Sequence, residues 1–242
     1  MDKRQIHTDG LSTGFHPGGN NERVLQQGLN LRLVQGELVC LLGLNGTGKS
    51  TLLRTLLGYQ KPIAGEVHIM GQKLSELSIK DIARRVAVVL TDRIEDPFLT
   101  AFEVALTGRY PYGMMISSIT AEDRRIVGDT FQRLSVSHLS DAVFQKLSDG
   151  EKQRVLIVRA IAQETPFIFM DEPVAYIDSP GKIMIMHLVR ELADTYQKGV
   201  IMATHDVESA FHFADRLWLL GKNKAFEEGN PQKLARSGSL NR

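Results

Sequence analysis

Cysteine is almost absent from this 242-residue chain, in which Cys40 is the single example. One cysteine cannot form an internal disulfide, so the chain fits a reducing compartment such as the cytosol. Cys40 lies in an apolar run, where a buried and inert thiol is expected. The sequence therefore predicts a fold that does not depend on disulfide bonds.

Long apolar runs and an excess of charge of one sign are also missing. The best membrane-like run, 155–162, is interrupted by Arg159, and residues 1–5 lack the apolar core of a signal peptide. We therefore expect any membrane role to come through a partner. The chain carries 29 Lys and Arg against 28 Asp and Glu, so its charge favours neither nucleic acid nor anionic lipid as a partner.

The pattern Gly-x-x-x-x-Gly-Lys-Ser occupies residues 43–50, between an apolar run, 38–42, and a helix-forming run, 50–57. This is the strand, loop and helix setting of a phosphate-binding loop. Glycines let several backbone N–H groups converge on one anion, and the helix N-terminus adds partial positive charge. The alternative is a glycine-rich turn that only ends a strand. The residues expected to bind the phosphates of a nucleotide are Gly43, Asn45, Gly46, Thr47, Gly48, Lys49, Ser50 and Thr51.

Within this loop Lys49 is expected to reach the β- and γ-phosphates, and the Ser50 hydroxyl to ligate Mg²⁺. A second apolar run, 167–170, ends in the acidic pair Asp171-Glu172. Ligands bind at the carboxyl ends of parallel strands. We expect Asp171 to hold Mg²⁺ and Glu172 to orient or deprotonate the attacking water. The alternative is a strand that ends in a solvated acidic turn.

Alternating strand-like and helix-like segments predict an α/β fold. Strands are expected at 6–15, 29–33, 38–42, 66–70, 86–90, 167–170, 200–203 and 217–220. Helices are expected at 50–57, 78–84, 100–108, 120–134, 183–196, 207–213 and 231–235. Because the middle of the chain shows helical patterns only, we predict a single domain of 1–242. Its α/β core, 1–92 and 161–242, would be interrupted by a helical subdomain, 93–160.

Residues 147–154 read Leu-Ser-Asp-Gly-Glu-Lys-Gln-Arg and resemble the L-S-G-G-Q signature of ATP-binding cassette (ABC) ATPases. The motifs occur in that family's order over nearly the full length. The chain thus resembles an ABC nucleotide-binding subunit, which implies a RecA-like P-loop NTPase core with a β edge subdomain and an inserted helical subdomain. Ser148 and Glu151 also match a capping box, and both interpretations can hold.

The resemblance implies roles for further residues. Phe15 would stack on adenine, or only pack the edge sheet. Ser148 and Gly150 would contact the γ-phosphate held by a second copy of the chain. Asp178 would belong to a loop that communicates across the dimer, or would cap the next helix. His205 matches the switch histidine that contacts the γ-phosphate and would be catalytic with Lys49 and Glu172.

The chain departs from the family pattern in two places, at Thr91 and within the signature. Thr91 stands where the family usually carries a glutamine, so its role as a Mg²⁺ ligand would need a bridging water or a loop shift, because its side chain is shorter. Asp149 and Glu151 replace a glycine and a glutamine of the signature. Since a carboxylate repels a γ-phosphate unless it points away, we expect Ser148 Oγ and the Gly150 amide to make the main contacts.

Residues 102–112, which include Gly-Arg-Tyr-Pro, resemble ATPases of importers for metal chelates such as iron–siderophore, haem and cobalamin. The resemblance implies a homodimer that sandwiches ATP and Mg²⁺, a transmembrane permease at the cytoplasmic face of the inner membrane, and indirectly a periplasmic or surface binding protein. A soluble ABC protein that switches without transport and an exporter ATPase are the alternatives. The single cassette and the intact Glu172 favour the importer.

Overall fold

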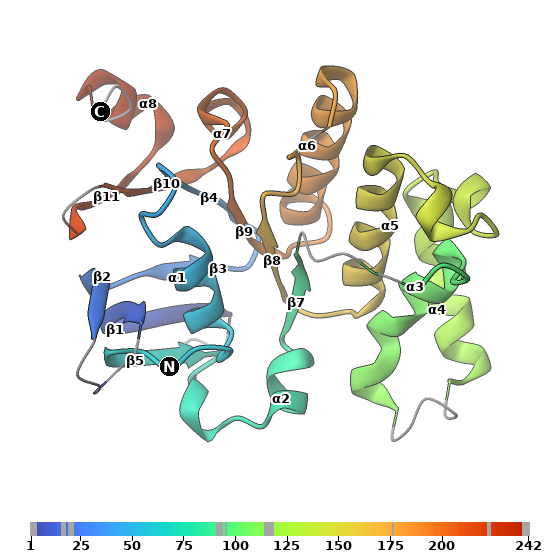
Figure 1. Cartoon of the computed structure of the whole chain (residues 1–242), viewed down its shortest axis with the longest axis horizontal. Helices are drawn as coiled ribbons and strands as arrows, with labels where there is room; N and C mark the ends of the chain where they lie inside the picture. Colours follow the sequence, from blue (N-terminus) through green and yellow to red (C-terminus); the bar gives the residue numbers. More distant parts are fainter. Residues whose placement is uncertain are drawn as a thin grey trace.

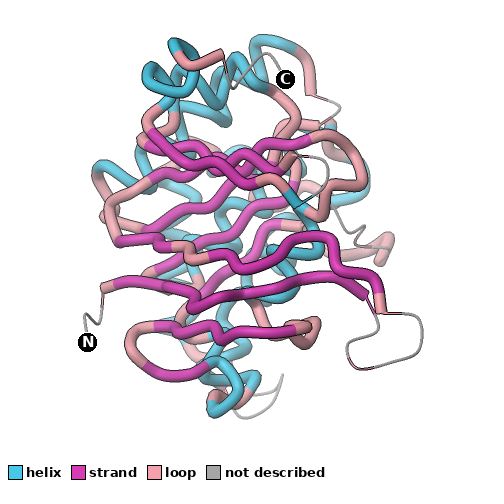
Figure 2. Tube along the Cα trace, turned by 90° about the vertical axis from the view of Figure 1, so that its left-hand side faces the viewer, coloured by secondary structure: helices cyan, strands magenta, loops and turns pink. Residues whose placement is uncertain are grey.

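The computed structural model describes residues 4–15, 18, 22–90, 94, 96–113, 119–175, 177–221 and 224–238. Two sheets lie on either side of helix α1 (Lys49–Leu56), and a group of helices stands beyond the larger sheet (Figure 1). In the view turned by 90°, the strands run across the molecule, with helices above and below them (Figure 2). The predicted α/β fold is confirmed.

The larger sheet has six strands in the order β11-β10-β4-β9-β8-β7, and all neighbours are parallel except β10 and β11. The smaller sheet is antiparallel, in the order β2-β1-β5-β6 with β3 paired to β1. The strands are β1 (Gln5–Phe15), β2 (Arg23–Leu29), β3 (Arg32–Val34), β4 (Leu38–Gly43), β5 (Ala64–Ile69), β6 (Gln72–Lys73), β7 (Val86–Val89), β8 (Phe167–Asp171), β9 (Gly199–Ala203), β10 (Arg216–Leu220) and β11 (Phe226–Gly229).

Short and long helices connect these strands. The α-helices after α1 are α2 (Ile79–Ala83), α3 (Ala101–Leu106), α4 (Ala121–Arg133), α5 (Asp149–Ala162), α6 (Ser179–Asp194), α7 (Val207–Phe213) and α8 (Pro231–Arg236). The 3-10 helices are η1 (Leu74–Glu76), η2 (Thr107–Tyr112), η4 (Ser137–Leu139) and η5 (Phe144–Lys146). Among the described residues, no helix is both long and apolar enough to cross a membrane.

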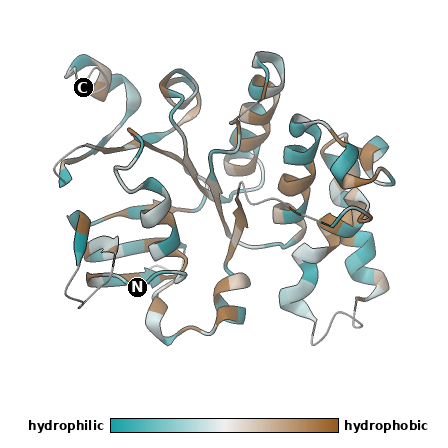
Figure 3. Cartoon of the chain, in the orientation of Figure 1, coloured by the Kyte–Doolittle hydropathy of each residue, from teal (hydrophilic) through white to brown (hydrophobic). Residues whose placement is uncertain are grey.

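Strand β4 is apolar throughout because both of its faces are buried. Leu38, Cys40 and Leu42 point into a hydrophobic cluster with the helices, whereas Val39 and Leu41 join a second cluster with α1 and the smaller sheet. This is the pattern expected of a parallel strand covered on two sides. Figure 3 shows the same apolar character along the central strands. Burial raises the pKa of the Cys40 thiol well above its usual range, so this thiol is inert, as expected.

Helices are the main elements of the described residues between β7 and β8. Side-chain caps begin its α-helices: Thr100 caps α3, Thr120 caps α4 and Ser148 caps α5, each in a capping box with an acidic residue three positions later. The apolar faces of α3, α4 and α5 belong to the same cluster as one face of the larger sheet. Their packing therefore fixes α5 against the strands that carry the acidic pair.

The predicted elements differ from the structure in several places. The strand expected at 29–33 is wrong, because Thr8 Oγ1 donates to Leu29 O (2.8 Å) and accepts from Leu31 N (2.8 Å), so the chain leaves the ladder between β2 and β3. Strand β2 was not predicted, since its glutamines hide any apolar alternation. Helix α6 begins four residues before the predicted 183, directly after its cap, Asp178.

The Gly-Arg-Tyr-Pro run, 108–111, lies in η2 and contacts the end of α5. Arg109, of which 7% is exposed, donates to Asp123 Oδ1 (2.8 Å), Glu164 Oε2 (2.7 Å) and the Ala162 carbonyl (2.7 Å). Its guanidinium also lies 4.3 Å from the ring centre of Tyr112. This run therefore has a structural role of its own, apart from any family resemblance.

We predict that Arg109→Met lowers the free energy of unfolding by about 3 kcal/mol, because it removes the cation paired with the largely buried Asp123 and leaves Asp123 Oδ1 and the Ala162 carbonyl without the Arg109 donor. Urea denaturation followed by circular dichroism measures this. Arg125→Met is the matched control, since Arg125 pairs with Glu122 and Asp129 on the exposed face of α4 and should leave the urea midpoint nearly unchanged. Equal effects of the two substitutions would contradict the assignment.

Candidate active site

Residues 43–50 form a tight loop between β4 and α1. Gly46 and Gly48 have φ angles of +82° and +102°, which side chains rarely tolerate. A Cβ atom on Gly43 would lie 2.6 Å from Leu220 O, so β4 can approach β10 closely only with glycine here. The loop is closed from within, because Thr47 donates through both its amide and its hydroxyl to Leu44 O.

Lys49 lies at the base of this loop and is 7% exposed. Its Nζ donates to the Gly43 carbonyl (2.7 Å) and lies 4.0 Å from Glu172 Oε1. A buried ammonium needs such partners, since an unpaired buried charge is costly. The Lys49 ammonium is therefore held against the backbone of the loop.

Glu172 follows β8 directly and is held in an unusual conformation. Its φ angle is +51°, which is uncommon for a residue with a side chain. The Glu172 amide donates to Ala203 O (2.9 Å), which ties the end of β8 to β9. Strained residues of this kind concentrate at functional sites.

The register of the parallel strands brings His205 to Glu172. Asp171 pairs with Ala203, and Ala203 pairs with Leu41, so β8, β9 and β4 end at the same edge of the sheet. His205 follows β9 there, and its Nδ1 lies 2.8 Å from Glu172 Oε2. The carboxylate thus lies between an imidazole and the ammonium of Lys49.

A cleft of about 540 Å³ opens beside these groups. Its walls include Asn45, Glu172, Val174, Ala175, Ile177, Lys182, His205 and Asp206. In Asp171, which directly precedes Glu172, the buried Oδ1 has no hydrogen-bond partner among the described residues. A buried carboxylate oxygen of this kind suits a cation, so Asp171 fits the oxygen ligands that Mg²⁺ prefers, as does the exposed hydroxyl of Ser50 in α1. Thr91, the third expected ligand, lies outside the described residues.

Sequence reasoning missed Asp206 and Lys182, which lie on the wall of this cleft. Lys182 Nζ lies 2.8 Å from Asp206 Oδ2, and Ser209 donates to Asp206 through its hydroxyl and amide. Burial opposes ionisation of Asp206, but these hydrogen bonds outweigh it and lower the pKa of the carboxyl to about 2. The carboxylate therefore stays charged and keeps Lys182 beside the cleft.

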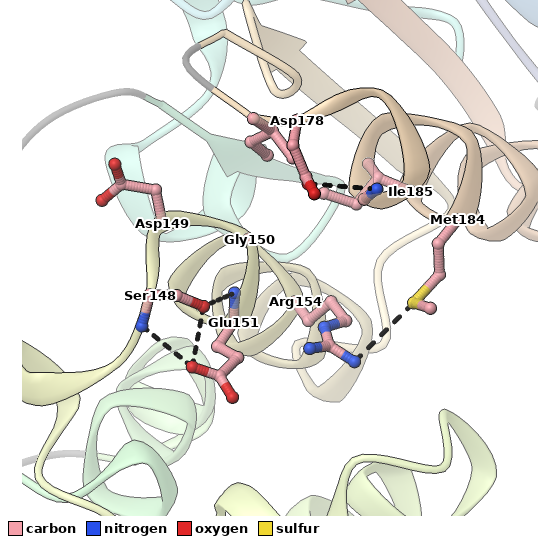
Figure 4. Close-up of a pocket in the computed structure, with 10 residues that line it drawn as sticks. Ser148, Asp149, Gly150, Glu151, Arg154, Asp178, Met184 and Ile185 are labelled. Atoms are coloured by element: carbon pink, nitrogen blue, oxygen red, sulfur yellow. Dashed lines mark hydrogen bonds between the residues drawn. The ribbon is translucent and has the colours of Figure 1, made fainter.

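The signature residues lie in a separate cavity of about 420 Å³ (Figure 4). Ser148 and Gly150 at the start of α5 face Asp178 at the start of α6 there. Ser148 Oγ donates to Glu151 Oε2 (2.7 Å) and accepts from the Glu151 amide (3.4 Å), so the expected capping box is present. The hydrogen bonds from the Ser148 hydroxyl and amide lower the pKa of Glu151, which therefore holds a negative charge beside Ser148.

The remaining expected residues are apart from the cleft. Asp178 caps α6 by accepting from Gly181 N (3.2 Å), so its alternative role as a cap is confirmed. Phe15 ends β1 with 43% of its surface exposed and lines neither cavity. Within one chain, the structure therefore unites Lys49, Glu172 and His205 but leaves the signature and Phe15 elsewhere.

Gln26 on β2 is a further residue that sequence reasoning missed. It is completely buried, and its Nε2 donates to the carbonyl of Thr47 (2.9 Å) inside the loop of residues 43–50. Its Oε1 is also buried, and no described residue forms a hydrogen bond with it. A buried glutamine on a strand was the available signal, but the sequence does not say which backbone group it holds. We assign Gln26 as a positioning residue of the loop.

Comparison with known proteins identifies this arrangement. A family model described as ABC transporter matches residues 26–175, more than half of the chain. The chain belongs to the ABC transporter family. Members of this family hydrolyse ATP, so the chain is an ATPase.

This ABC ATPase is similar to named relatives over most of its length. It is 36% identical over 236 residues to an uncharacterised ABC transporter ATP-binding protein of Methanocaldococcus jannaschii, covering 98% of this chain and 80% of that protein. It is 30% identical over 226 residues to the ferric enterobactin transport ATP-binding protein of Escherichia coli, covering 93% and 83%.

Solved structures show the same fold. An inward-facing ABC transporter of metal-chelate type matches with a TM-score of 0.84 and 26% identity, over 98% of this chain and 87% of that chain. A dimeric bacterial ABC transporter cassette matches with a TM-score of 0.78 and 27% identity, over 93% of this chain and 98% of that chain. The predicted P-loop NTPase fold of this ABC ATPase is confirmed.

We predict that Gln26→Met weakens the loop, because it leaves the Thr47 carbonyl without its donor at a cost of about 1–3 kcal/mol. Part of this cost should appear as weaker ATP binding, measured by isothermal titration beside the urea midpoint. Gln27→Met is the matched control, since Gln27 is exposed on the same strand. If both variants bind ATP like the wild type, Gln26 does not position the loop.

Proposed function

We propose that this ABC ATPase is the ATP-hydrolysing subunit of an importer that takes up a metal chelate through a membrane permease. Support comes from the relative named for ferric enterobactin transport and from others named for iron(3+)-hydroxamate and cobalamin import. The inward-facing metal-chelate transporter of similar fold adds to it. The observation that carries the hydrolytic part is the contact of Glu172 with His205, 2.8 Å long, next to Lys49.

The proposed mechanism gives each residue of the site a separate role. Lys49 Nζ exchanges the Gly43 carbonyl for phosphate oxygens of ATP, which offer it more negative charge. Glu172 accepts the proton of the attacking water, and His205 holds the Glu172 carboxylate and contacts the γ-phosphate. Mg²⁺, when bound by Ser50 and Asp171, neutralises phosphate charge. Gly43, Asn45, Gly46, Thr47, Gly48 and Thr51 complete the ATP-binding loop, and Phe15 would stack on adenine.

A second copy of the chain would complete the site. Ser148 and Gly150 line a different cavity from Glu172, so one chain does not bring its own signature into its own cleft. The exposed N–H groups at the start of α5 suit a phosphate supplied by the partner. The Glu151 carboxylate opposes this attraction, and Ser148 must then rotate its hydroxyl from Glu151 toward the phosphate.

The permease would place this subunit at the cytoplasmic face of the membrane, and a binding protein outside would deliver the cargo.

The two alternative functions would give different experimental results. A soluble ABC switch would bind ATP but form no complex with a membrane protein, and an exporter ATPase would support no uptake. Reconstitution with its permease and assays of siderophore, haem and cobalamin uptake decide among them. ATP-dependent uptake of one chelate is expected, and export alone would refute the proposal.

We predict that Glu172→Gln binds Mg-ATP but hydrolyses it at least about 100-fold more slowly, because an amide keeps the shape and loses the proton acceptor. Lys49→Ala should instead weaken ATP binding itself. Phosphate release and nucleotide titration separate the two effects. Glu191→Gln, on the exposed side of α6, is the control. Near-wild-type turnover of the Glu172 variant would mean that the base lies elsewhere.

We also predict that two inactive variants restore activity when mixed. In a heterodimer of Lys49→Ala and Ser148→Arg chains, one site combines an intact loop with an intact signature. Phosphate release should therefore recover in part. The control mixes Lys49→Ala with the double variant Lys49→Ala/Ser148→Arg, which leaves no intact site. Heterodimers that form without any recovery would argue against sites shared between chains.

A further inference from the structure

The smaller sheet carries two histidines side by side, and neither is among the residues assigned to ATP. His7 on β1 pairs directly with His68 on β5, and their rings stack with centres 4.7 Å apart and an angle of 5° between planes. Both strands lie next to each other at the edge of the molecule that carries the N-terminus (Figure 1). Neither histidine has a part in the proposed hydrolysis.

Two carboxylates occupy the next row of the same face. Asp9 pairs with Glu66 in the register, two residues along each strand from the histidines. Asp9 Oδ2 lies 3.4 Å from His68 Nδ1 and 3.9 Å from His7 Nε2. One ligand atom each from His7, Asp9 and His68 lies within 4.8 Å of the others.

The histidines are unsatisfied in a way that points to a ligand. His68 is 6% exposed, and its buried Nδ1 has no hydrogen-bond partner within the part of the chain that the structure describes. His7 Nδ1 is likewise buried without a partner. Buried polar atoms are nearly always satisfied, so two such nitrogens in one stacked pair require an explanation.

The surroundings of His68 fit a metal ligand held by a supporting carboxylate. Glu66 Oε2 lies 3.7 Å from His68 Nε2, on the opposite side of the ring from Asp9. Lys73 Nζ donates to Glu66 Oε1 (2.8 Å) and fixes that carboxylate in place. Metal-bound histidines commonly have such a carboxylate at their other nitrogen.

We propose that His7, His68 and Asp9 bind a divalent transition metal ion of the Zn²⁺ class, with Glu66 as the supporting carboxylate. Imidazole suits Zn²⁺, Ni²⁺ and Cu²⁺, whereas Mg²⁺ prefers oxygen ligands. Metal–nitrogen distances of about 2.0–2.1 Å require the three ligand atoms to approach within about 3–4 Å of each other. The Asp9 side chain, which is 66% exposed, has room to move inward, and the two stacked imidazole rings must turn so that one nitrogen of each points at the ion. The ion would link β1 to β5.

The backbone around Asp9 supports this placement. The ladder between β1 and β5 shifts register between Asp9 and Ser12, and Gly10 has a φ angle of +59°. A Cβ atom on Gly65 would lie 2.5 Å from Asp9 O, so the two strands approach closely at this point. The bulge therefore fixes Asp9 beside the histidine pair. Bulges often direct a side chain toward a site.

The test is a Zn²⁺ titration of the untagged, nucleotide-free chain by isothermal calorimetry, repeated with Mg²⁺. One Zn²⁺ per chain with a Kd in the micromolar range is expected, and no Mg²⁺ at this site. His68→Gln and Asp9→Asn should each weaken Zn²⁺ binding at least about 10-fold, and Glu66→Gln about 10-fold. His212→Gln changes an exposed histidine on α7 and should bind like the wild type.

Asp9→Asn decides the outcome if the buried His68 variant does not fold. Wild-type protein that binds no Zn²⁺ below millimolar concentration would overturn the proposal. So would Zn²⁺ binding that Asp9→Asn and Glu66→Gln leave unchanged. Since neither Lys49 nor Glu172 is involved, the result is independent of whether ATP is hydrolysed.

Discussion

The in-register pairing of β4, β9 and β8 is the constraint on which the candidate active site depends. Because these parallel strands end together, the phosphate-binding loop, His205 and the acidic pair meet at one edge although they are far apart in sequence. The strands are held by burial on both faces. That burial can offset the local strain at Glu172, a residue in the left-handed region, which costs about 1–3 kcal/mol.

The charges at this edge are arranged for an anion and a cation that bind together. Lys49 holds its ammonium against a backbone carbonyl, and Asp171 keeps one buried oxygen without a donor. Phosphates and Mg²⁺ would satisfy both groups at once. The signature residues lie in another cavity, which accounts for why a single chain presents an incomplete site under the proposed function.

The sequence predicted the residues whose chemistry leaves few alternatives. Gly46 and Gly48 were predictable because only glycine adopts their backbone angles readily, and Glu172 because it directly follows a buried strand. Capping boxes at Thr100 and Ser148 were also readable, since both partners lie within one turn. Such signals involve residues that are close together in the sequence, so they can be read without knowledge of the fold.

Contacts between distant segments could not be predicted. From the sequence, Gln26 has the character of a surface residue. Its hydrogen bond to Thr47 depends on the position of β2, and β2 itself lacks apolar alternation. The pairing of His7 with His68 depends on a cross-strand register that no single strand encodes. The Gly-Arg-Tyr-Pro run resembled a family marker, but the ion pairs of Arg109 appear only once α4 and α5 are in place.

The central claim, that ATP is bound by two chains together, is tested most directly by sedimentation velocity of Glu172→Gln with the bound nucleotide counted. With ATP and Mg²⁺ the account predicts a dimer that carries two ATP molecules, and monomers with ADP. A monomer that retains one ATP per chain, with no dimer at any protein concentration or in the presence of the permease, would contradict it.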